Sequence, residues 1–240
     1  MSAALEIRNI TKSFGGLQAL SDVSCTVPSG TIYGVIGPNG AGKTTLFNCM
    51  SGALRPDAGE ILVGSLSVRG LQPHDICRHG LVRTFQIVRP FRSMTVLENV
   101  KVAAFSRHVD AGGAERAAIA ALTKLNMAGF SDRPASTLGL AALRRLEMAR
   151  AIATEPQVLL LDEMLAGLTA VETAELSDQV RALNADGLTI VIVEHSIPVI
   201  RSLCARAVVL DFGRVLMEGE INDVLEDRRV QDAYLGSQPA

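Results

Sequence analysis

One eight-residue segment, GPNGAGKT from Gly37 to Thr44, constrains this chain more than any other. It fits the pattern G-x-x-x-x-G-K-[ST], follows the apolar segment TIYGVIG and precedes a predicted helix from about Lys43 to Ser51. In that context the glycines let backbone N–H groups converge on phosphates, and the helix adds the partial positive charge of its N-terminus. The segment therefore predicts a phosphate loop, in which Lys43 reaches the phosphates and the Thr44 hydroxyl ligates Mg²⁺.

Other apolar segments predict the sheet that carries this loop. QVLLLD (157–162) and LTIVIVE (188–194) are almost wholly apolar, and each follows a helical segment. Continuous apolar strands that alternate with helices indicate a parallel sheet covered on both faces. The first thirty residues instead alternate apolar and polar side chains around turn residues, as at residues 5–8 and 23–27, which is typical of half-exposed antiparallel strands.

The middle of the chain has a different composition. From about Met94 to Leu146 it is rich in Ala, Leu, Lys and Arg without a clear strand pattern, which predicts an inserted helical subdomain. RAVVLDFGRVLMEG, near the end, predicts a two-strand hairpin that turns at Asp211-Phe212-Gly213. The sequence thus predicts an α/β fold: a phosphate-loop NTPase core with a mainly parallel sheet, an N-terminal antiparallel β subdomain and an inserted α-helical subdomain.

We expect these parts to form a single domain over residues 1–240. The expected parts are the antiparallel subdomain (about 1–30 and 58–70), the nucleotide core (about 31–57, 80–93 and 147–210), the helical subdomain (about 94–146) and the C-terminal hairpin and helices (206–240).

Charge and cysteine content argue against several classes of function. The formal net charge of −2 at pH 7 gives no electrostatic reason to expect a nucleic-acid partner. The four cysteines (Cys25, Cys49, Cys77 and Cys204) lie far apart, so we expect free thiols in a reducing cytosol rather than a zinc site or a disulfide frame. The N-terminal segment indicates no signal peptide, and the apolar runs are too short to cross a bilayer. If the chain serves a membrane process, another chain supplies the membrane part.

An acid pair, Asp162-Glu163, ends the VLLL strand. The tip of a buried parallel strand lies at the crevice where such folds bind ligands. There Asp162 would hold the Mg²⁺ shell and Glu163 would activate water as a general base. By itself such a pair is often a helix N-cap. His195, at the end of the next strand, and Gln86, in RTFQ, are weak signals alone: a structural histidine and a solvated glutamine are the ordinary alternatives.

The order of these features resembles the ATPase subunit of ABC transporters over essentially the whole chain. The resemblance implies ATP and Mg²⁺ as cofactors. It implies that Gln86 contacts Mg²⁺ and the attacking water, that His195 contacts the γ-phosphate, and that Phe14, in TKSFGG, stacks on adenine. A core position between strands is the alternative for Phe14. The implied nucleotide-binding residues are Phe14, Gly37, Pro38, Asn39, Gly40, Ala41, Gly42, Lys43, Thr44 and Thr45.

Longer segments narrow the resemblance. RTFQIVRPFRSMTVLENVKVA, RRLEMARAIATEPQVLLLDE and IVIVEHSIPVI are similar to the ATPase subunits of branched-chain amino-acid importers and their amide and urea relatives. This resemblance implies a cytoplasmic subunit at the inner face of the cell membrane, membrane permease partners, a second and non-identical ATPase, and indirectly a substrate-binding protein.

The segment LGLAA takes its interpretation from this family. In isolation it reads as an apolar helix entry. The segment consists of Leu138, Gly139, Leu140, Ala141 and Ala142. It begins twelve residues before Arg150, and at this distance from the corresponding arginine the family carries its signature LSGGQ. In the family this signature acts in trans, on the ATP of the other subunit of a head-to-tail pair. Here the serine hydroxyl is replaced, so a hydrogen bond worth roughly 1.5–3 kcal/mol is lost, and alanine in place of glycine could exclude a positive φ. We expect this chain's own site to hydrolyse ATP and the partner's ATP, facing LGLAA, to be hydrolysed poorly.

Two further residues depart from the family pattern. Met164 stands where the family usually has proline and Thr169 where it often has aspartate, and both bear on communication between sites.

The alternative functions are a lipid-export ATPase, a soluble ABC ATPase of DNA repair, translation or cofactor assembly, and an ATP-binding regulator with weak hydrolysis. Against the soluble class stand the balanced charge and the single phosphate loop; against the regulator stand Glu163 and His195.

Overall fold

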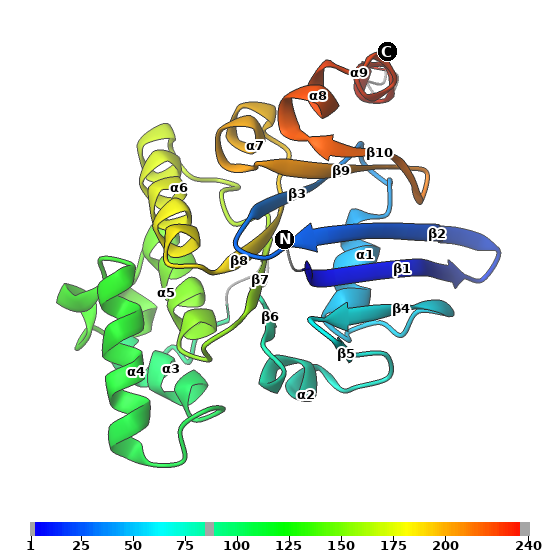
Figure 1. The fold of residues 1–240 in the computed structure, drawn as a ribbon. Helices are drawn as coiled ribbons and strands as arrows, with labels where there is room; N and C mark the ends of the chain where they lie inside the picture. Colours follow the sequence, from blue (N-terminus) through cyan, green and yellow to red (C-terminus); the bar gives the residue numbers. More distant parts are fainter. Residues whose placement is uncertain (1–2, 85–88, 236–240) are drawn as a thin grey trace.

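Six strands form one mainly parallel sheet in the computed structural model, which describes residues 3–84 and 89–235 (Figure 1). The order across the sheet is β10-β9-β3-β8-β7-β6, and only β10 runs antiparallel to its neighbour. The bounds are β3 Ile32–Ile36, β6 Leu81–Arg83, β7 Val158–Asp162, β8 Thr189–Val193, β9 Arg206–Asp211 and β10 Arg214–Glu220. The segments predicted as parallel strands, 157–162 and 188–194, are the neighbours β7 and β8.

A second sheet of four antiparallel strands has the order β2-β1-β4-β5. Its bounds are β1 Ala3–Phe14, β2 Leu17–Pro28, β4 Ala58–Val63 and β5 Leu66–Ser67. The first two strands are longer than the alternating segments alone predict. Asn9 and Asp22 have positive φ angles of 53° and 56°, and a 2.7 Å hydrogen bond from Asn9 Nδ2 to Asp22 Oδ1 joins them. These irregularities interrupt the alternation without ending the pairing.

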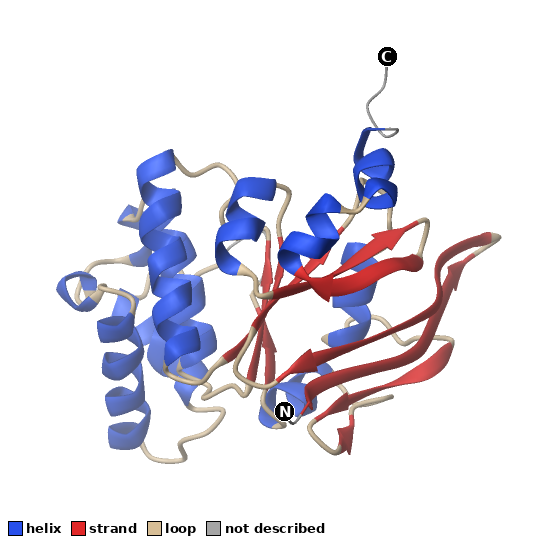
Figure 2. Ribbon diagram, turned by 45° about the horizontal axis from the view of Figure 1, so that its top comes forward, coloured by secondary structure: helices blue, strands red, loops and turns tan. Residues whose placement is uncertain are grey.

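The helices divide between the two faces of the six-stranded sheet. Their bounds are α1 Lys43–Met50, α2 Pro73–Arg78, α3 Val96–Ala104, α4 Ala111–Lys124, α5 Leu140–Ile152, α6 Ala170–Ala185, α7 Ile197–Leu203, α8 Ile221–Glu226 and α9 Arg228–Leu235. Figure 2 shows α5, α6 and α7 on one side of the sheet, and α1 with the antiparallel sheet on the other. Of the described residues between Met94 and Leu146 none belongs to a named strand, which agrees with the predicted helical character of this region.

Burial on both faces explains why the parallel strands are so apolar. Every residue of β3, β7 and β8 is buried. Along β7, Leu159 and Leu161 join the core formed with the helices α3 to α6, whereas Val158 and Leu160 join the core formed with α1 and the N-terminal strands. Successive side chains of a strand point to opposite faces, so each position is apolar.

The end of the chain forms the expected hairpin. β9 and β10 pair around a turn at Phe212 and Gly213, and β9 also pairs with β3, so the hairpin extends the six-stranded sheet. Helices α8 and α9 follow. Within the described ranges no helix has both the length and the apolar character that crossing a membrane requires.

The buried hydrogen bonds of the Asn99 side chain are expected to stabilise the fold. This side chain is completely buried; Nδ2 donates to the carbonyls of Phe91 (3.0 Å) and Thr95 (2.9 Å), and Oδ1 accepts from the Phe91 N–H (2.8 Å). Asn99→Leu removes these bonds and leaves main-chain groups to find other partners. We expect it to lower the free energy of unfolding by about 1–3 kcal/mol, measured by urea denaturation. Glu115→Gln, which disrupts the exposed Lys101–Glu115 ion pair, is the control and should change stability less. An equal effect of both variants would contradict this role for Asn99.

Candidate functional site

The predicted phosphate loop leaves β3 and enters α1, and it forms the floor of a cleft of about 450 Å³. Gly42 is the N-cap of α1 with a φ of 103°, a conformation that favours glycine. The cleft is lined by Asn39 to Thr45, by Phe14, Leu17, Gln18 and Ala19 from the β1–β2 hairpin, by Glu163 and His195, and by Phe212 and Gly213. Residues far apart in the sequence therefore meet around the loop.

Lys43 lies buried beneath this loop. Its ammonium group donates to the carbonyl oxygens of Gly37 (2.7 Å) and Pro38 (2.8 Å). Burial lowers the pKa of Lys43, and the nearby Glu163 carboxylate opposes that shift. The positive charge is thus held next to the main chain of the loop, where an anion bound in the cleft can reach it.

Glu163 and His195 come together at the cleft wall. Asp162 of β7 pairs in register with Val193 of β8, so the residues that follow the two strands lie side by side. His195 Nε2 is 2.7 Å from Glu163 Oε1. Glu163 has a φ of 48°, a conformation that costs a non-glycine residue about 1–3 kcal/mol and is found mainly at functional sites. The pair can receive and hold a proton.

Asp162 lies behind the cleft and does not line it. Its Oδ2 accepts a 2.6 Å hydrogen bond from Arg83, and both side chains are more than nine-tenths buried. Arg83 also donates to Asn48 Oδ1 (2.6 Å) and Ser51 Oγ (3.2 Å), which joins β6, β7 and α1. Sequence reasoning missed Arg83; its position three residues before Gln86 was the available signal. Gln86 itself lies outside the described residues.

Phe14 lines the cleft from the β1–β2 hairpin. It is 45% exposed, so it is not the core residue that the alternative interpretation required. The Lys12 ammonium is 5.5 Å from the centre of its ring. Asp57 fixes this segment, because its carboxylate accepts from Lys12 Nζ (2.8 Å) and from the Ser13 N–H (2.7 Å); these bonds lower the pKa of Asp57.

Two residues that the sequence did not single out support the site from behind. Glu194 Oε1 accepts from the Leu165 N–H (2.9 Å), and burial raises the pKa of Glu194. Tyr234 of α9 accepts a 2.8 Å hydrogen bond on its hydroxyl from the Gly37 N–H. No local sequence signal marks Tyr234, since the bond spans the length of the chain.

The segment LGLAA lies elsewhere, and none of its residues lines the cleft. Leu138 is buried in the core, Gly139 is the N-cap of α5, and Leu140 begins the helix with 45% of its surface exposed. Gly139 has a φ of −74°, and residues 140–142 are helical. In this conformation none of residues 139–142 has a positive φ, so alanine in place of glycine does not strain the backbone here. The helix begins at the surface without a side-chain cap.

Comparison with known proteins identifies the family. The sequence model described as ABC transporter matches residues 20–166, more than half of the chain. The chain belongs to the ABC transporter family.

Several relatives are similar to this chain over nearly its whole length. BraF of Pseudomonas aeruginosa, a high-affinity branched-chain amino acid transport ATP-binding protein, is 38% identical over 97% of each chain. LptB of Acidithiobacillus ferridurans, a lipopolysaccharide export system ATP-binding protein, is 33% identical over 99% of each chain. An ATP-binding cassette of an ABC transporter, solved in its ADP conformation, is 30% identical with a TM-score of 0.89, covering 98% of this chain and 100% of that one. The chain is thus an ATP-binding subunit of an ABC transporter and an ATPase, and the predicted fold class is confirmed.

The cleft suits the cofactors of this family, ATP and Mg²⁺. Helix α1 has neither a side-chain cap nor an acid in its first turn, so its N-terminal N–H groups suit a phosphate. No cluster of three or more metal-ligating His, Cys, Asp or Glu side chains occurs in the described ranges.

The two departures from the ABC pattern have local roles. Met164 is buried in the core. Thr169 is the N-cap of α6: its hydroxyl accepts from the Glu172 N–H (3.3 Å), and the Glu172 carboxylate accepts from the Thr169 N–H (2.9 Å). Thr169 therefore stabilises the start of its own helix.

The buried Arg83–Asp162 pair generates a second prediction. Arg83→Met leaves a buried carboxylate without its counter-ion, so we expect a loss of about 3–5 kcal/mol in the free energy of unfolding, measured in urea. The double variant Arg83→Met with Asp162→Asn removes both charges and should recover most of that loss. A double variant as unstable as the single one would show that the charge pairing is not the cause.

Proposed function

We propose that this chain is the ATP-hydrolysing subunit of an ABC importer for branched-chain amino acids or related small amides, and that it works at the inner face of the cell membrane with permease subunits. One observation carries the hydrolytic role: the Glu163–His195 pair shares its cleft with the phosphate loop. The resemblance to BraF over nearly the whole chain supports the class of cargo. A substrate-binding protein would deliver that cargo to the permease, and no nucleic-acid partner is required.

The roles of the site residues follow from their chemistry. Lys43 and the N–H groups of residues 40–45 bind the phosphates, and Phe14 stacks on adenine. Thr44 would ligate Mg²⁺, Asp162 would hold it through water from behind the cleft, and Gln86 would be a further ligand; when bound, Mg²⁺ neutralises charge on the phosphates. Arg83 fixes one oxygen of Asp162 and so holds the carboxylate in place.

Glu163 acts as the general base. Its carboxylate accepts a proton from the attacking water, and His195 orients it through the 2.7 Å contact and stabilises the proton that arrives. The strained φ of Glu163 keeps the carboxylate directed at the cleft.

Glu163→Gln keeps the size of the side chain and removes its basicity. We expect ATP hydrolysis by the assembled transporter to fall at least a hundredfold at this site, while the Kd for ATP changes less than threefold. Phosphate release and titration calorimetry measure the two quantities. Glu175→Gln, on the exposed face of α6, is the control and should hydrolyse normally. Full hydrolysis by Glu163→Gln would rule out the general-base role.

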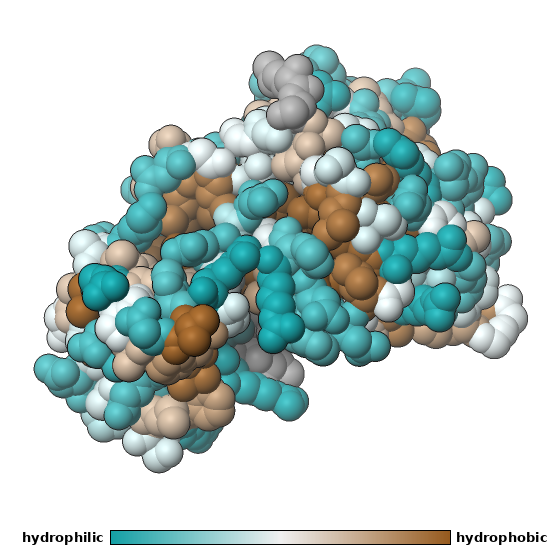
Figure 3. Space-filling view, turned by 60° about the horizontal axis from the view of Figure 1, so that its bottom comes forward, coloured by the Kyte–Doolittle hydropathy of each residue, from teal (hydrophilic) through white to brown (hydrophobic). Residues whose placement is uncertain are grey.

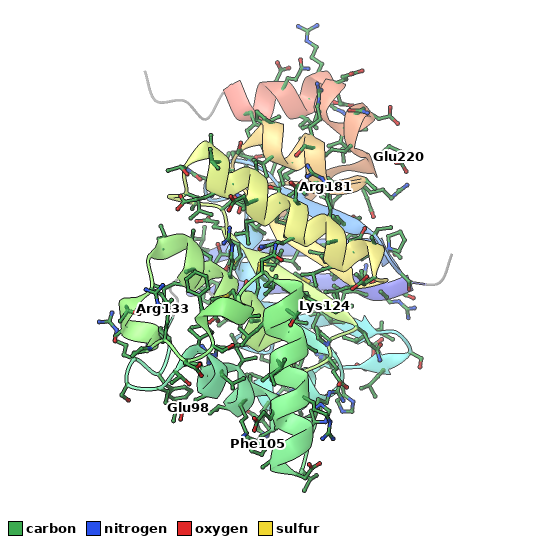
Figure 4. All side chains as sticks on the ribbon, turned by 90° about the vertical axis from the view of Figure 1, so that its left-hand side faces the viewer. Glu98, Phe105, Lys124, Arg133, Arg181 and Glu220 are labelled. Carbon is green, nitrogen blue, oxygen red and sulfur yellow. The ribbon has the colours of Figure 1, made fainter. Side chains whose placement is uncertain are left out.

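Exposed hydrophobic residues in and just before the helical region support contact with a permease. Phe91, Met94, Val102 and Phe105 are each between 37% and 48% exposed. The face in Figure 3 is largely hydrophilic with separate hydrophobic patches, one on the lobe that carries the helical region. Phe105 lies near the edge of this lobe in Figure 4. We propose that residues 94–146 form a helical subdomain that, with the Gln86 segment, passes ATP-driven motion to the membrane subunits.

We further propose a pair of non-identical ATPases with unequal sites. The N-terminus of α5 at Gly139 is exposed and uncapped, which suits contact with the nucleotide of a partner subunit. Without the serine hydroxyl it offers only main-chain groups and the helix dipole. The partner's ATP, facing Leu138 to Ala142, is therefore hydrolysed slowly, whereas this chain's own ATP faces an intact signature.

Replacement of Gly139 by serine tests this asymmetry. We expect Gly139→Ser to raise turnover at the partner's site about ten- to a hundredfold, because it restores a hydrogen bond to a charged group. The measurement uses the assembled complex with Glu163→Gln, which silences this chain's own site. If Glu163→Gln alone leaves total turnover intact while the equivalent change in the partner abolishes it, the partner's site hydrolyses ATP and this chain's own site does not, which contradicts the proposal.

Lipid export is a second candidate, favoured by the 33% identity to LptB. Coexpression with importer permease subunits and uptake of radiolabelled leucine into vesicles separates the two: ATP-dependent uptake supports import, and its absence together with activity in a lipid-export complex supports the alternative.

A further inference from the structure

The turn between β9 and β10 carries a residue that its backbone disfavours. Phe212 and Gly213 are the only two residues between the paired ends of the strands, Asp211 and Arg214, and their φ angles are 42° and 75°. Two-residue hairpins with positive φ at both positions strongly prefer Asn-Gly or Asp-Gly. A bulky aromatic side chain at positive φ is a conformational outlier. Phe212 therefore makes the turn less stable than asparagine would.

Packing of the ring does not offset this cost. Phe212 is 87% exposed, so its ring gains little from burial within the chain. An exposed phenylalanine at a strained backbone position has no benefit for folding. Strained positions of this kind are found mainly where a side chain serves binding or catalysis.

The turn is fixed to the phosphate loop. The Gly213 N–H donates to the Ala41 carbonyl (3.0 Å), and the Ser21 N–H donates to the Gly213 carbonyl (2.8 Å). A Cβ on Gly213 would lie 2.6 Å from the carbonyl oxygen of Ala19, so the turn is in close contact with β2. Phe212 is thus held in a defined place relative to the nucleotide cleft.

Polar and apolar groups both line the cleft. The phosphate loop and Lys43 provide polar groups. Phe14, Leu17 and Phe212, which are 45%, 71% and 87% exposed, line the same cleft from two different hairpin turns. Three exposed hydrophobic side chains around one cleft suit a flat apolar group, and a nucleotide base stacks on aromatic rings.

We propose that Phe212 is a second base-binding aromatic residue, which acts with Phe14 to hold the adenine ring in the cleft. This inference rests on the proposed nucleotide-binding role of the cleft. It assigns to the β9–β10 turn a part in affinity and in base selection, at the expense of the stability of that turn.

Phe212→Asn in the full-length chain tests the proposal, because stability and affinity should change in opposite directions. We expect the melting temperature to rise, since asparagine suits the turn. We expect the Kd for MgATP to increase about five- to fiftyfold, because stacking on an aromatic side chain contributes to base binding. Inorganic triphosphate, which has no base, should bind as tightly as to the unmodified chain. Phe212→Trp should keep the affinity for MgATP.

Leu66→Asn is the matched control, because Leu66 is 39% exposed on β5 and lies outside the cleft lining; the Kd for MgATP should stay the same. A Kd for Phe212→Asn within twofold of the original would overturn the proposal, and so would a lower melting temperature. Equal weakening of MgATP and triphosphate would overturn it by assigning Phe212 to the shape of the loop. Unchanged nucleotide binding with loss of the second ATPase subunit would assign Phe212 to that interface instead. Lys43→Ala distinguishes a failure of the role proposed for Phe212 from a failure of the proposed nucleotide site. If Lys43→Ala still binds both MgATP and triphosphate, the proposed nucleotide site itself is wrong.

Discussion

The backbone of Gly37 approaches the neighbouring strand β9 more closely than any side chain permits. Its φ is +145°, and a Cβ there would lie 2.1 Å from the carbonyl oxygen of Leu210. Only glycine fits this contact, which lets the phosphate loop leave β3 against the end of β9. Two hydrogen bonds then hold the loop in place. The Gly37 N–H donates to the Tyr234 hydroxyl, and the Gly213 N–H donates to the Ala41 carbonyl. The cleft depends on this packing because the phosphate loop forms much of its lining.

The register of the parallel strands brings the proposed catalytic side chains to this loop. Asp162 of β7 lies opposite Val193 of β8, and β8 in turn pairs with β3, which leads into the loop. Parallel strands of one sheet end at the same edge, so the residues just beyond them share one crevice. Glu163 and His195 therefore meet although 32 residues separate them. A slip of one residue between β7 and β8 would turn every side chain of the slipped strand to the opposite face, and the packing of the β7 side chains in two different cores opposes such a slip.

Residues with a contiguous signal could be placed from the sequence. The phosphate loop is marked by eight consecutive residues, and Glu163 and His195 by the ends of apolar strands. Arg83 pairs with an acid 79 residues further on, and Tyr234 with a glycine 197 residues earlier, so no local pattern predicts either contact. Phe212 had a signal, a bulky residue in a predicted turn, but its place beside the loop follows from the fold. The strands β1 and β2 run longer than their alternation predicts because bulges interrupt the pattern without ending the pairing.

The larger helices differ in how they begin. α3, α4 and α6 start at Thr95, Asp110 and Thr169, whose side chains accept hydrogen bonds from the first turn. α1 and α5 start at Gly42 and Gly139 with no side-chain cap and no acid in the first turn. First-turn N–H groups have no partner within their own helix, so these two ends keep their hydrogen-bonding capacity and positive dipole for an external anion. The end of α1 opens into the chain's own cleft, whereas the end of α5 lies at the surface outside it. In the proposed pair of ATPase subunits, the nucleotide of the partner would lie at this exposed end of α5.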